Sequence, residues 1–263
     1  MQCNICKYES KYIFNAKILN KYLINYFYCN NCEFLQTEEP YWLNEAYSEA
    51  ISSLDTGLVS RNISLSKFTT LFLYLFFNKN FQYLDYGGGH GLFVRMMRDI
   101  GFDFYWQDLY AKNIFARGFE LNLKNNKINL ITTFECFEHF VDPNKEFENM
   151  LQISSNILFS TSLLPNTIPA PDKWLYYALE SEQHISFYSL KTLNFIADKY
   201  NLNIYSWGSI HFFTHKKLNR FLLYIIKYYK NDWIFKFLKN RSGSKTNLDM
   251  LLIKNKSINE NSL

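Results

Sequence analysis

The sequence predicts an α/β fold in which helices cover both faces of a mostly parallel sheet, preceded by a small N-terminal segment built around cysteines. Three observations predict it. A strand runs into a glycine-rich turn and a helix at 83–93, further strand-like segments alternate with helical ones, and two Cys-x2-Cys pairs lie near the N-terminus. Alternation of strands with helices is typical of parallel sheets.

The bulk composition fits a packed globular protein. The chain has 263 residues, 48% of them apolar and 19% aromatic, which is enough to build a core. The N-terminus lacks the apolar core of a signal peptide, and no run reaches the ~18 apolar residues of a membrane span, so we expect a cytoplasmic protein. A net charge of +4 is too small to indicate a nucleic-acid partner.

The turn after the first strand of the expected sheet has a composition suited to a cofactor. Gly87, Gly89 and Gly91 alternate along it, so the backbone can adopt positive φ and a ligand can approach closely. The dinucleotide fingerprint G-x-G-x-x-G would need glycine where Leu92 stands. Asp85, just before the turn, would repel a pyrophosphate and suits a neutral or cationic ligand, for which S-adenosylmethionine is the natural candidate. The alternative is that Asp85 only caps a helix or ends a strand.

The spacing Asp85-x-Gly-x-Gly-x-Gly resembles the first motif of class I S-adenosylmethionine-dependent methyltransferases. Asp108 ends the next expected strand, 102–108, where the family binds both ribose hydroxyls with a carboxylate; the alternative is an ordinary loop acid. The run 135–143 is similar to the E-x-x-E-H-x-x-x-P run of many small-molecule members. The resemblance covers about residues 80–207 and implies a Rossmann-like, mostly parallel seven-stranded sheet with helices on both faces.

Further elements follow the resemblance. We expect strands at 128–134, 156–160 and 203–207, and a proline-rich extended loop at 163–172. We expect helices at 65–77, after Pro143, and from Ser189 as N-cap through Lys199.

These elements divide the chain into expected parts. A zinc-binding segment occupies 1–40, a helical cap or linker 41–80, the methyltransferase domain 81–255, and a polar tail 256–263. The basic, aromatic segment 216–241 is expected to be a helical insertion in the terminal β-hairpin, whose last strand would be 249–254. It could contact an anionic membrane surface or a lipid-linked glycan, or be an ordinary amphipathic hairpin.

The four N-terminal cysteines have the spacing of a structural zinc site. Two pairs, each with two residues between its members, are separated by 22 residues that can form a short hairpin. Reduced thiols or redox chemistry are the alternatives. Lys7 and Glu33 stand where such knuckles often carry glycine. The expected Zn²⁺ ligands are Cys3, Cys6, Cys29 and Cys32.

Methyl transfer to a weakly acidic acceptor needs a base. The resemblance places two histidines on the acceptor side, His184 and His139, and a carboxylate such as Glu138 or Glu182 could orient either ring. Both can also be structural residues. Glu135 is a further candidate, for the methionine end of the cofactor, and the alternative is an ordinary strand-end acid.

The expected function is therefore methyl transfer to a sugar or other small polar metabolite, such as a nucleotide-sugar or glycan in surface-polysaccharide synthesis. Zinc-bearing N-termini occur in sugar C-methyltransferases and in some ribosomal RNA methyltransferases. The second pair here, Cys29-x2-Cys32, is more similar to the former than to the Cys-x3-His of the latter. A catalytically silent scaffold and an RNA methyltransferase remain the alternatives, and oxygen, nitrogen and carbon acceptors all stay open.

Overall fold

The computed structural model describes residues 1–46, 55–180 and 184–260. It divides into two compact units, the first formed by Met1–Asp55 and Thr132–Lys217 and the second by Thr56–Ile131 and Leu218–Leu263. Two sheets run through the described chain, with strand orders β1-β2-β3-β8 and β5-β4-β6-β7-β10-β9. The larger sheet is mostly parallel, which confirms the predicted fold class.

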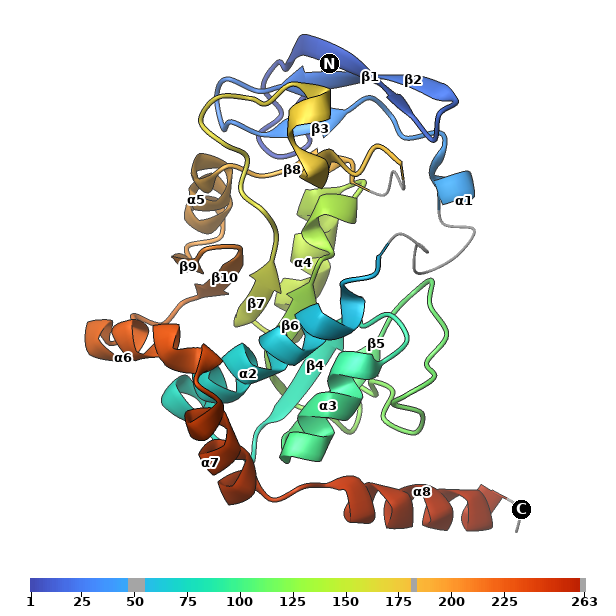
Figure 1. The fold of residues 1–263 in the computed structure, drawn as a ribbon, viewed down its shortest axis with the longest axis vertical. Helices are drawn as coiled ribbons and strands as arrows, with labels where there is room; N and C mark the ends of the chain where they lie inside the picture. Colours follow the sequence, from blue (N-terminus) through green and yellow to red (C-terminus); the bar gives the residue numbers. More distant parts are fainter. Residues whose placement is uncertain (47–54, 181–183, 261–263) are drawn as a thin grey trace. The chain divides into compact units, whose positions relative to one another are not determined.

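In the first unit the N-terminal chain forms a small antiparallel sheet (Figure 1). Strands β1 (Lys11–Ile18) and β2 (Tyr22–Tyr28) are the hairpin expected between the cysteine pairs. Strand β3 (Leu35–Thr37) adds to β2, and β8 (Ser186–Phe187) adds to β3. An aromatic and aliphatic cluster that includes Tyr26, Trp42, Tyr177 and Phe187 is buried against this sheet.

The rest of the first unit carries the end of the larger sheet and two capped helices. Strand β10 (Ile210–Thr214) lies antiparallel to both β7 (Ile157–Ser160) and β9 (Asn203–Trp207). Helix α4 (Pro143–Ile153) begins where the Asp142 side chain accepts the Lys145 N–H. Helix α5 (Leu190–Lys199) begins at a capping box in which Ser189 is the N-cap, as predicted. The short elements are α1 (Leu43–Ala46), η1 (Phe137–His139), η2 (Pro171–Lys173) and η3 (Leu175–Tyr177).

In the second unit a parallel pair of strands is packed against helices. Strand β4 (Gln82–Tyr86) pairs with β5 (Asp103–Gln107), and the two are joined by α3 (Leu92–Ile100). Helix α2 (Leu58–Phe76) begins earlier than the sequence predicted, and its apolar C-terminal half is buried. Strand β6 (Ile128–Phe134) carries the chain from the second unit into the first.

The described part of the larger sheet has six strands where seven were expected. At the β5 edge, Trp106 makes an isolated parallel bridge to Glu120. The Trp106 N–H donates to the Phe119 carbonyl, and the Leu121 N–H donates to the Trp106 carbonyl. This single bridge stands where a further edge strand would pair with β5.

The prediction for the C-terminal segment was wrong. Strands β9 and β10 already form a hairpin, closed at Gly208 with φ of 67°, so the segment 216–241 is not an insertion in it. The expected strand 249–254 lies inside a helix, because a short apolar run fits either structure until its neighbours are known. The C-terminal elements are α6 (Arg220–Ile225), η4 (Ile226–Lys230), α7 (Asp232–Ser242) and α8 (Thr246–Glu260).

Helix α8 is held in the second unit by a buried ion pair. Asp249 is 1% exposed and accepts two bonds from Arg98, Nε to Oδ2 at 2.8 Å and Nη2 to Oδ1 at 2.7 Å. Arg95 adds a third bond at 2.8 Å. Arg98 also donates to Asp103 and to the Phe104 carbonyl, so one guanidinium joins α8, α3 and β5.

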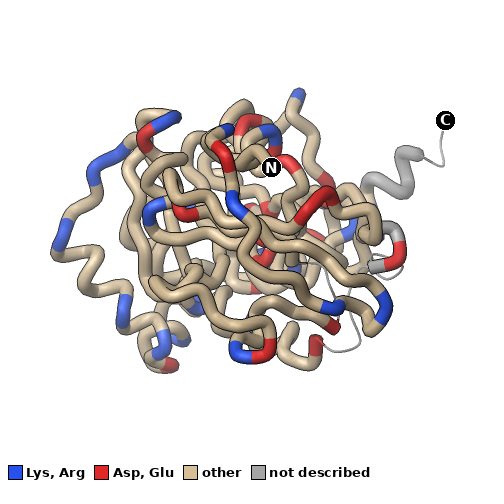
Figure 2. The backbone as a smooth tube through the Cα atoms, turned by 90° about the horizontal axis from the view of Figure 1, so that it is seen from above, with Lys and Arg blue, Asp and Glu red and all other residues tan. Residues whose placement is uncertain are grey.

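Charges of both signs are interspersed along much of the chain (Figure 2). None of the helices within the described ranges combines the length and apolar character needed to cross a bilayer.

Asp249→Asn should lower the free energy of unfolding by about 3 kcal/mol at pH 7, because it leaves Arg98 buried without its bidentate partner. Burial disfavours the ionised carboxylate, but Arg98 and Arg95 hold the pKa of Asp249 below its ordinary value. Its stabilising effect is therefore present above the pKa of the unfolded chain and is lost as pH falls through the folded pKa. Urea unfolding at pH 7 and pH 3 measures this, and the difference between the proteins should shrink at pH 3.

Asp232→Asn is the matched control, since Asp232 is 84% exposed in its pair with Lys67 and should change stability by less than about 1 kcal/mol. Equal stability of wild type and Asp249→Asn at pH 7 would contradict the assigned role of the ion pair.

Candidate functional site

The glycine turn in the second unit has the backbone conformation that the sequence predicted. Gly87, Gly89 and Gly91 have φ of 68°, 53° and 85°, values that residues with a side chain rarely adopt. A Cβ on Gly88 would lie 2.8 Å from Oδ2 of Asp85, and one on Gly91 would lie 2.8 Å from Oδ1 of Asn113. A Cβ on Gly89 would meet nothing within 4 Å, so this stretch of backbone faces open space that a ligand can fill.

Both polar backbone atoms of Gly89 are held by the end of β5. The Trp106 indole donates to the Gly89 carbonyl at 2.8 Å, and the Gly89 N–H donates to Oδ2 of Asp108 at 2.9 Å. The Gly88 N–H donates to the Gln107 carbonyl at 3.1 Å. The turn is thus fixed before any ligand binds, which lowers the entropy cost of binding.

The two predicted cofactor carboxylates occupy different surroundings. Asp85 is 4% exposed, at the end of β4 and beneath Gly88. Asp108 is half-buried, and its Oδ1 accepts the N–H groups of Tyr110 and Ala111 at 2.8 and 2.7 Å. Since a carboxylate offers about four acceptor positions, Oδ2 retains room for one hydroxyl besides the Gly89 N–H. The residues present therefore fit an adenosyl ligand at this turn.

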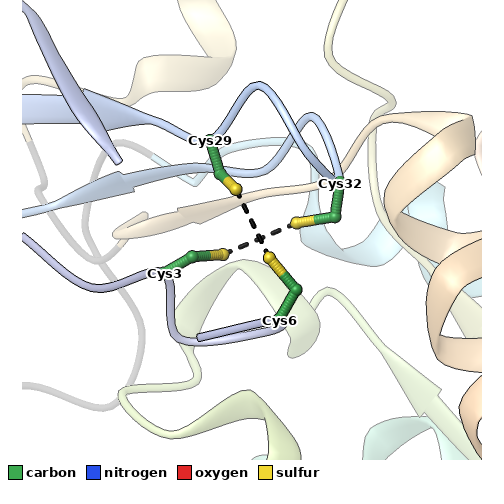
Figure 3. Close-up of side chains that lie close together, drawn as sticks. All are labelled: Cys3, Cys6, Cys29 and Cys32. Atoms are coloured by element: carbon green, nitrogen blue, oxygen red, sulfur yellow. Dashed lines mark hydrogen bonds between the residues drawn. The ribbon is translucent and has the colours of Figure 1, made fainter. Parts of the chain in front are cut away.

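The four N-terminal cysteines converge in the first unit, as the sequence predicted. Their sulfurs point toward one another, and the two close pairs, Cys3–Cys32 and Cys6–Cys29, cross in the view of Figure 3. The Sγ atoms of these pairs are 3.5 and 3.4 Å apart, and all four lie within 4.8 Å of one another. The contact with Cys32 lowers the pKa of Cys3 to about 5, while the same contact and burial raise the pKa of Cys32. Four ionised sulfurs in this space would need a cation.

The two cysteine knuckles share one backbone conformation. Lys7 and Glu33, the residues after the second cysteine of each pair, have φ of 62° and 60°. Their N–H groups donate to the carbonyls of Cys3 and Cys29, at 3.0 and 2.7 Å. The left-handed turn usual at these positions is therefore kept without glycine, at a cost of about 1 kcal/mol for each residue.

Hydrogen bonds tie both knuckles to the rest of the first unit. Asn144, at the start of α4, donates to the carbonyls of Asn4 and Ile5. Thr192, at the start of α5, donates to the Cys32 carbonyl at 2.8 Å. Because β3 begins three residues after Cys32 and pairs with β8, the second knuckle is connected to the chain just after His184.

Three of the four predicted catalytic residues come together in the first unit. Glu138, His139 and His184 each place a ligand-type atom within 4.8 Å of the other two, and the two imidazole rings lie edge to face at 4.9 Å. Glu138 and His139 belong to η1, directly after β6, and His184 lies just before β8. Glu182, the fourth predicted residue, lies outside the described residues.

The chemistry of this group is set by burial and by one main-chain bond. Glu138 is fully buried, and burial together with the charge of Glu135 raises its pKa to about 8. His184 Nδ1 lies 2.7 Å from the Tyr176 carbonyl. A carbonyl only accepts, so in the neutral ring Nδ1 carries the proton and Nε2 carries the lone pair.

Glu135 is held in an unusual conformation at the end of β6. Its φ is 54°, its N–H donates to the Ser160 hydroxyl at 2.8 Å, and that hydroxyl donates to Oε1 of Glu135 at 2.5 Å. Non-glycine residues with positive φ cluster at functional sites. Sequence reasoning missed Ser160 and Trp106, since their roles depend on contacts between distant segments; only their positions near strand ends could have indicated them.

Comparison with known proteins gives the family. Residues 61–206 match the family described as a methyltransferase domain. No curated protein matches the sequence. Similar solved structures include the plantazolicin methyltransferase BpumL with SAH (13% identity, 78% of this chain and 89% of that chain, TM-score 0.47). They also include human N-acetylserotonin methyltransferase with SAM (14% identity, 59% of this chain and 52% of that chain, TM-score 0.44). A third is the mitomycin 7-O-methyltransferase MmcR (11% identity, 57% of this chain and 53% of that chain, TM-score 0.39).

With TM-scores below 0.5, these structural similarities carry no argument about the acceptor. The family match spans more than half of the chain and includes the glycine turn, Asp108 and the Glu138–His139 pair. The chain therefore belongs to the methyltransferase-domain family and is a class I S-adenosylmethionine-dependent methyltransferase.

Proposed function

We propose that the enzyme methylates a sugar or another small polar metabolite, as a free, nucleotide-linked or glycan-linked acceptor in surface-polysaccharide synthesis. The observation that carries the proposal is the grouping of Glu138, His139 and His184 in the first unit. A polar acceptor such as a sugar hydroxyl needs hydrogen-bonding and proton-accepting groups, which this cluster offers. The cysteine-bearing N-terminal segment, similar to that of sugar C-methyltransferases, supports the same substrate class.

When bound, S-adenosylmethionine supplies an activated methyl group on a sulfonium. The protein's part is to hold the donor and prepare the acceptor. In the proposed arrangement the glycine turn and Asp85 bind the donor, and Asp108 Oδ2 accepts from a ribose hydroxyl. Glu135, in the first unit, is proposed from the sequence alone as a residue for the methionine end.

His184 is the proposed base. Its Nδ1 proton is directed at the Tyr176 carbonyl, so the lone pair on Nε2 can accept a proton from the acceptor. His139 packs edge to face against this ring and is the second candidate. Glu138 and Glu182 are proposed to orient the histidines or balance their charge.

The glycine turn is tested by S-adenosylmethionine affinity. Asp85→Ala and Gly89→Val should abolish binding in calorimetry, the first by removing the buried carboxylate and the second by filling the open side of the turn. Gly208→Val is the matched control, because Gly208 also has positive φ and open space at its Cβ position, but lies in the β9–β10 hairpin. Undiminished affinity in Gly89→Val would contradict the assignment of the turn.

The base is tested by separating binding from turnover. His184→Ala should reduce the release of S-adenosylhomocysteine about 100- to 10,000-fold, the usual contribution of a general base, while leaving donor affinity unchanged. A panel of nucleotide-linked sugars identifies the acceptor with the wild type, and His215→Ala serves as an exposed-histidine control. Unchanged turnover in His184→Ala would remove His184 from the mechanism.

We propose that the cysteine cluster holds one structural Zn²⁺. In a tetrahedral Zn–S4 site with Zn–S distances of about 2.3 Å, neighbouring sulfurs lie about 3.8 Å apart. The two close pairs, at 3.4 and 3.5 Å, are near this value. Four protein ligands leave no open position, so the metal would stabilise the fold rather than take part in the reaction.

Elemental analysis should find one zinc per chain that depends on Cys29 and is lost in Cys29→Ser. Metal loss should also raise hydrogen exchange in β3 and β8, because the knuckle that ends at Cys32 positions β3. Peptides from β4, in the second unit, provide the internal control. A folded protein that lacks zinc and keeps full protection in β3 and β8 would contradict the structural role.

We also propose peripheral membrane contact through 216–241. This segment carries a single acidic residue, Asp232, among eight basic ones. Its inner side packs on α2, where Tyr229 contacts Phe68 and Ile226 is fully buried. Aromatic side chains and lysines together favour an anionic lipid surface. The exposed aromatic residues are Phe221, Tyr224, Tyr228, Trp233 and Phe237.

The wild type should sediment with phosphatidylglycerol vesicles, whereas a Trp233→Ala/Phe237→Ala variant should stay in the supernatant. The reason is that both rings are exposed and stack on each other. Neither protein should sediment with vesicles of phosphatidylcholine alone. If the same fraction of both proteins sedimented with both vesicle types, the proposed contact would be ruled out.

A further inference from the structure

Among the residues that the structure describes, a second group besides the cysteines has the composition of a metal site. Glu138, His139 and His184 supply one carboxylate and two imidazoles whose ligand atoms all lie within 4.8 Å of one another. Two histidines and one carboxylate are a recurrent ligand set for divalent transition metals, which they bind while leaving coordination positions open.

The carboxylate of Glu138 independently indicates a missing partner. Its side chain is fully buried, and neither Oε1 nor Oε2 meets the geometry of a hydrogen bond within the described chain. The hydroxyls of Tyr176 and Thr161 act on this carboxyl only weakly, because burial and the charge of Glu135 outweigh them and raise its pKa. Buried carboxylates without a partner are costly, and proteins nearly always satisfy them with donors, a proton or a cation. A cation shared with His139 and His184, whose ligand atoms lie within 4.8 Å, would satisfy Glu138.

The orientation of His184 is that of a metal ligand. Its Nδ1 lies 2.7 Å from the Tyr176 carbonyl, which fixes the tautomer with the lone pair on Nε2. Metal-binding histidines almost always donate their second ring N–H to a carboxylate, carbonyl or water in this way.

The two segments that carry the ligands are fixed to each other before any ion binds. The Ile185 N–H donates to the Glu138 carbonyl at 2.8 Å, and the Ser186 hydroxyl donates to the Phe140 carbonyl at 2.9 Å. A preformed ligand set of this kind loses little entropy when a cation enters.

We propose that Glu138, His139 and His184 bind a divalent transition-metal cation such as Zn²⁺ or Co²⁺. In the loaded protein Nε2 of His184 is a ligand of the cation, so the cation takes over the part that the metal-free protein assigns to His184 as the base. The cation then lowers the pKa of an acceptor hydroxyl at an open coordination position, and that proton leaves to water. This second step rests on the proposed function, because an unassisted imidazole is a weak base for a sugar hydroxyl.

The experiment titrates Co²⁺ into the full chain, purified with its cysteine-bound zinc and treated with a mild chelator to empty weaker sites. Calorimetry and the visible absorption of Co²⁺ should report one further ion per chain, with nitrogen and oxygen ligands and without thiolate charge-transfer bands. Glu138→Gln and His184→Ala should each weaken this binding more than about 100-fold, since changes outside the ligand shell alone cost about 10- to 100-fold.

Glu138→Gln keeps the size of the side chain, and retention of the Cys29-dependent zinc shows that the variant is folded. His215→Ala, which removes an exposed histidine, should bind Co²⁺ like the wild type. Absence of a further ion in the wild type, or unweakened binding in both ligand variants, overturns the proposal.

Turnover separates this proposal from the proposed function. Full turnover with the Glu138–His139–His184 group empty of metal overturns the step assigned to the cation and leaves methyl transfer to a small polar acceptor intact. Failure to bind S-adenosylmethionine overturns the proposed function, whereas the Co²⁺ titration still decides whether the cation site exists.

Discussion

The turn proposed to bind the cofactor depends on one constraint, the positive φ of its glycines after β4. Three alternate glycines make that conformation available, and the end of β5 fixes it by holding both polar backbone atoms of Gly89, the carbonyl through Trp106 and the N–H through Asp108. Asp85 can lie buried beneath the turn only because position 88 has no Cβ. The local sequence of the second unit thus produces a rigid stretch of backbone with one open side. The Arg98–Asp249 pair connects α3 and α8, and Arg98 also bonds to β5.

A separate constraint operates in the first unit. The second knuckle leads into β3, β3 pairs with β8, and β8 begins two residues after His184. Hydrogen bonds from Asn144 and Thr192 attach the same knuckles to α4 and α5. A segment that looks like an independent appendage in the sequence is therefore part of the framework that positions the proposed base. If the cluster holds the proposed Zn²⁺, this connection would link the metal to the segment that carries the proposed base.

Local signals determined what the sequence could predict. The predictions that succeeded depend on nearby residues. They are the positive φ at alternate glycines, the hairpin between the cysteine pairs, the helix start at Pro143, the cap at Ser189 and most strand positions. The helix at Asp249 was missed because a short apolar run fits either structure, and the ion pair that attaches it to α3 involves Arg98, 151 positions away. The pairing of β3 with β8 likewise depends on contacts between distant segments. So do the hydrogen bonds from Trp106 to Gly89 and from Ser160 to Glu135, and no local sequence pattern indicates such contacts.

The central claim is that the glycine turn binds the methyl donor, and a crystal structure of the protein with S-adenosylhomocysteine tests it most directly. We predict electron density for the adenosyl group against the open side of Gly89, with a ribose hydroxyl at Oδ2 of Asp108. A turn that stays empty while the ligand is bound elsewhere, or a turn whose open side is filled by the protein's own side chains, would contradict the account.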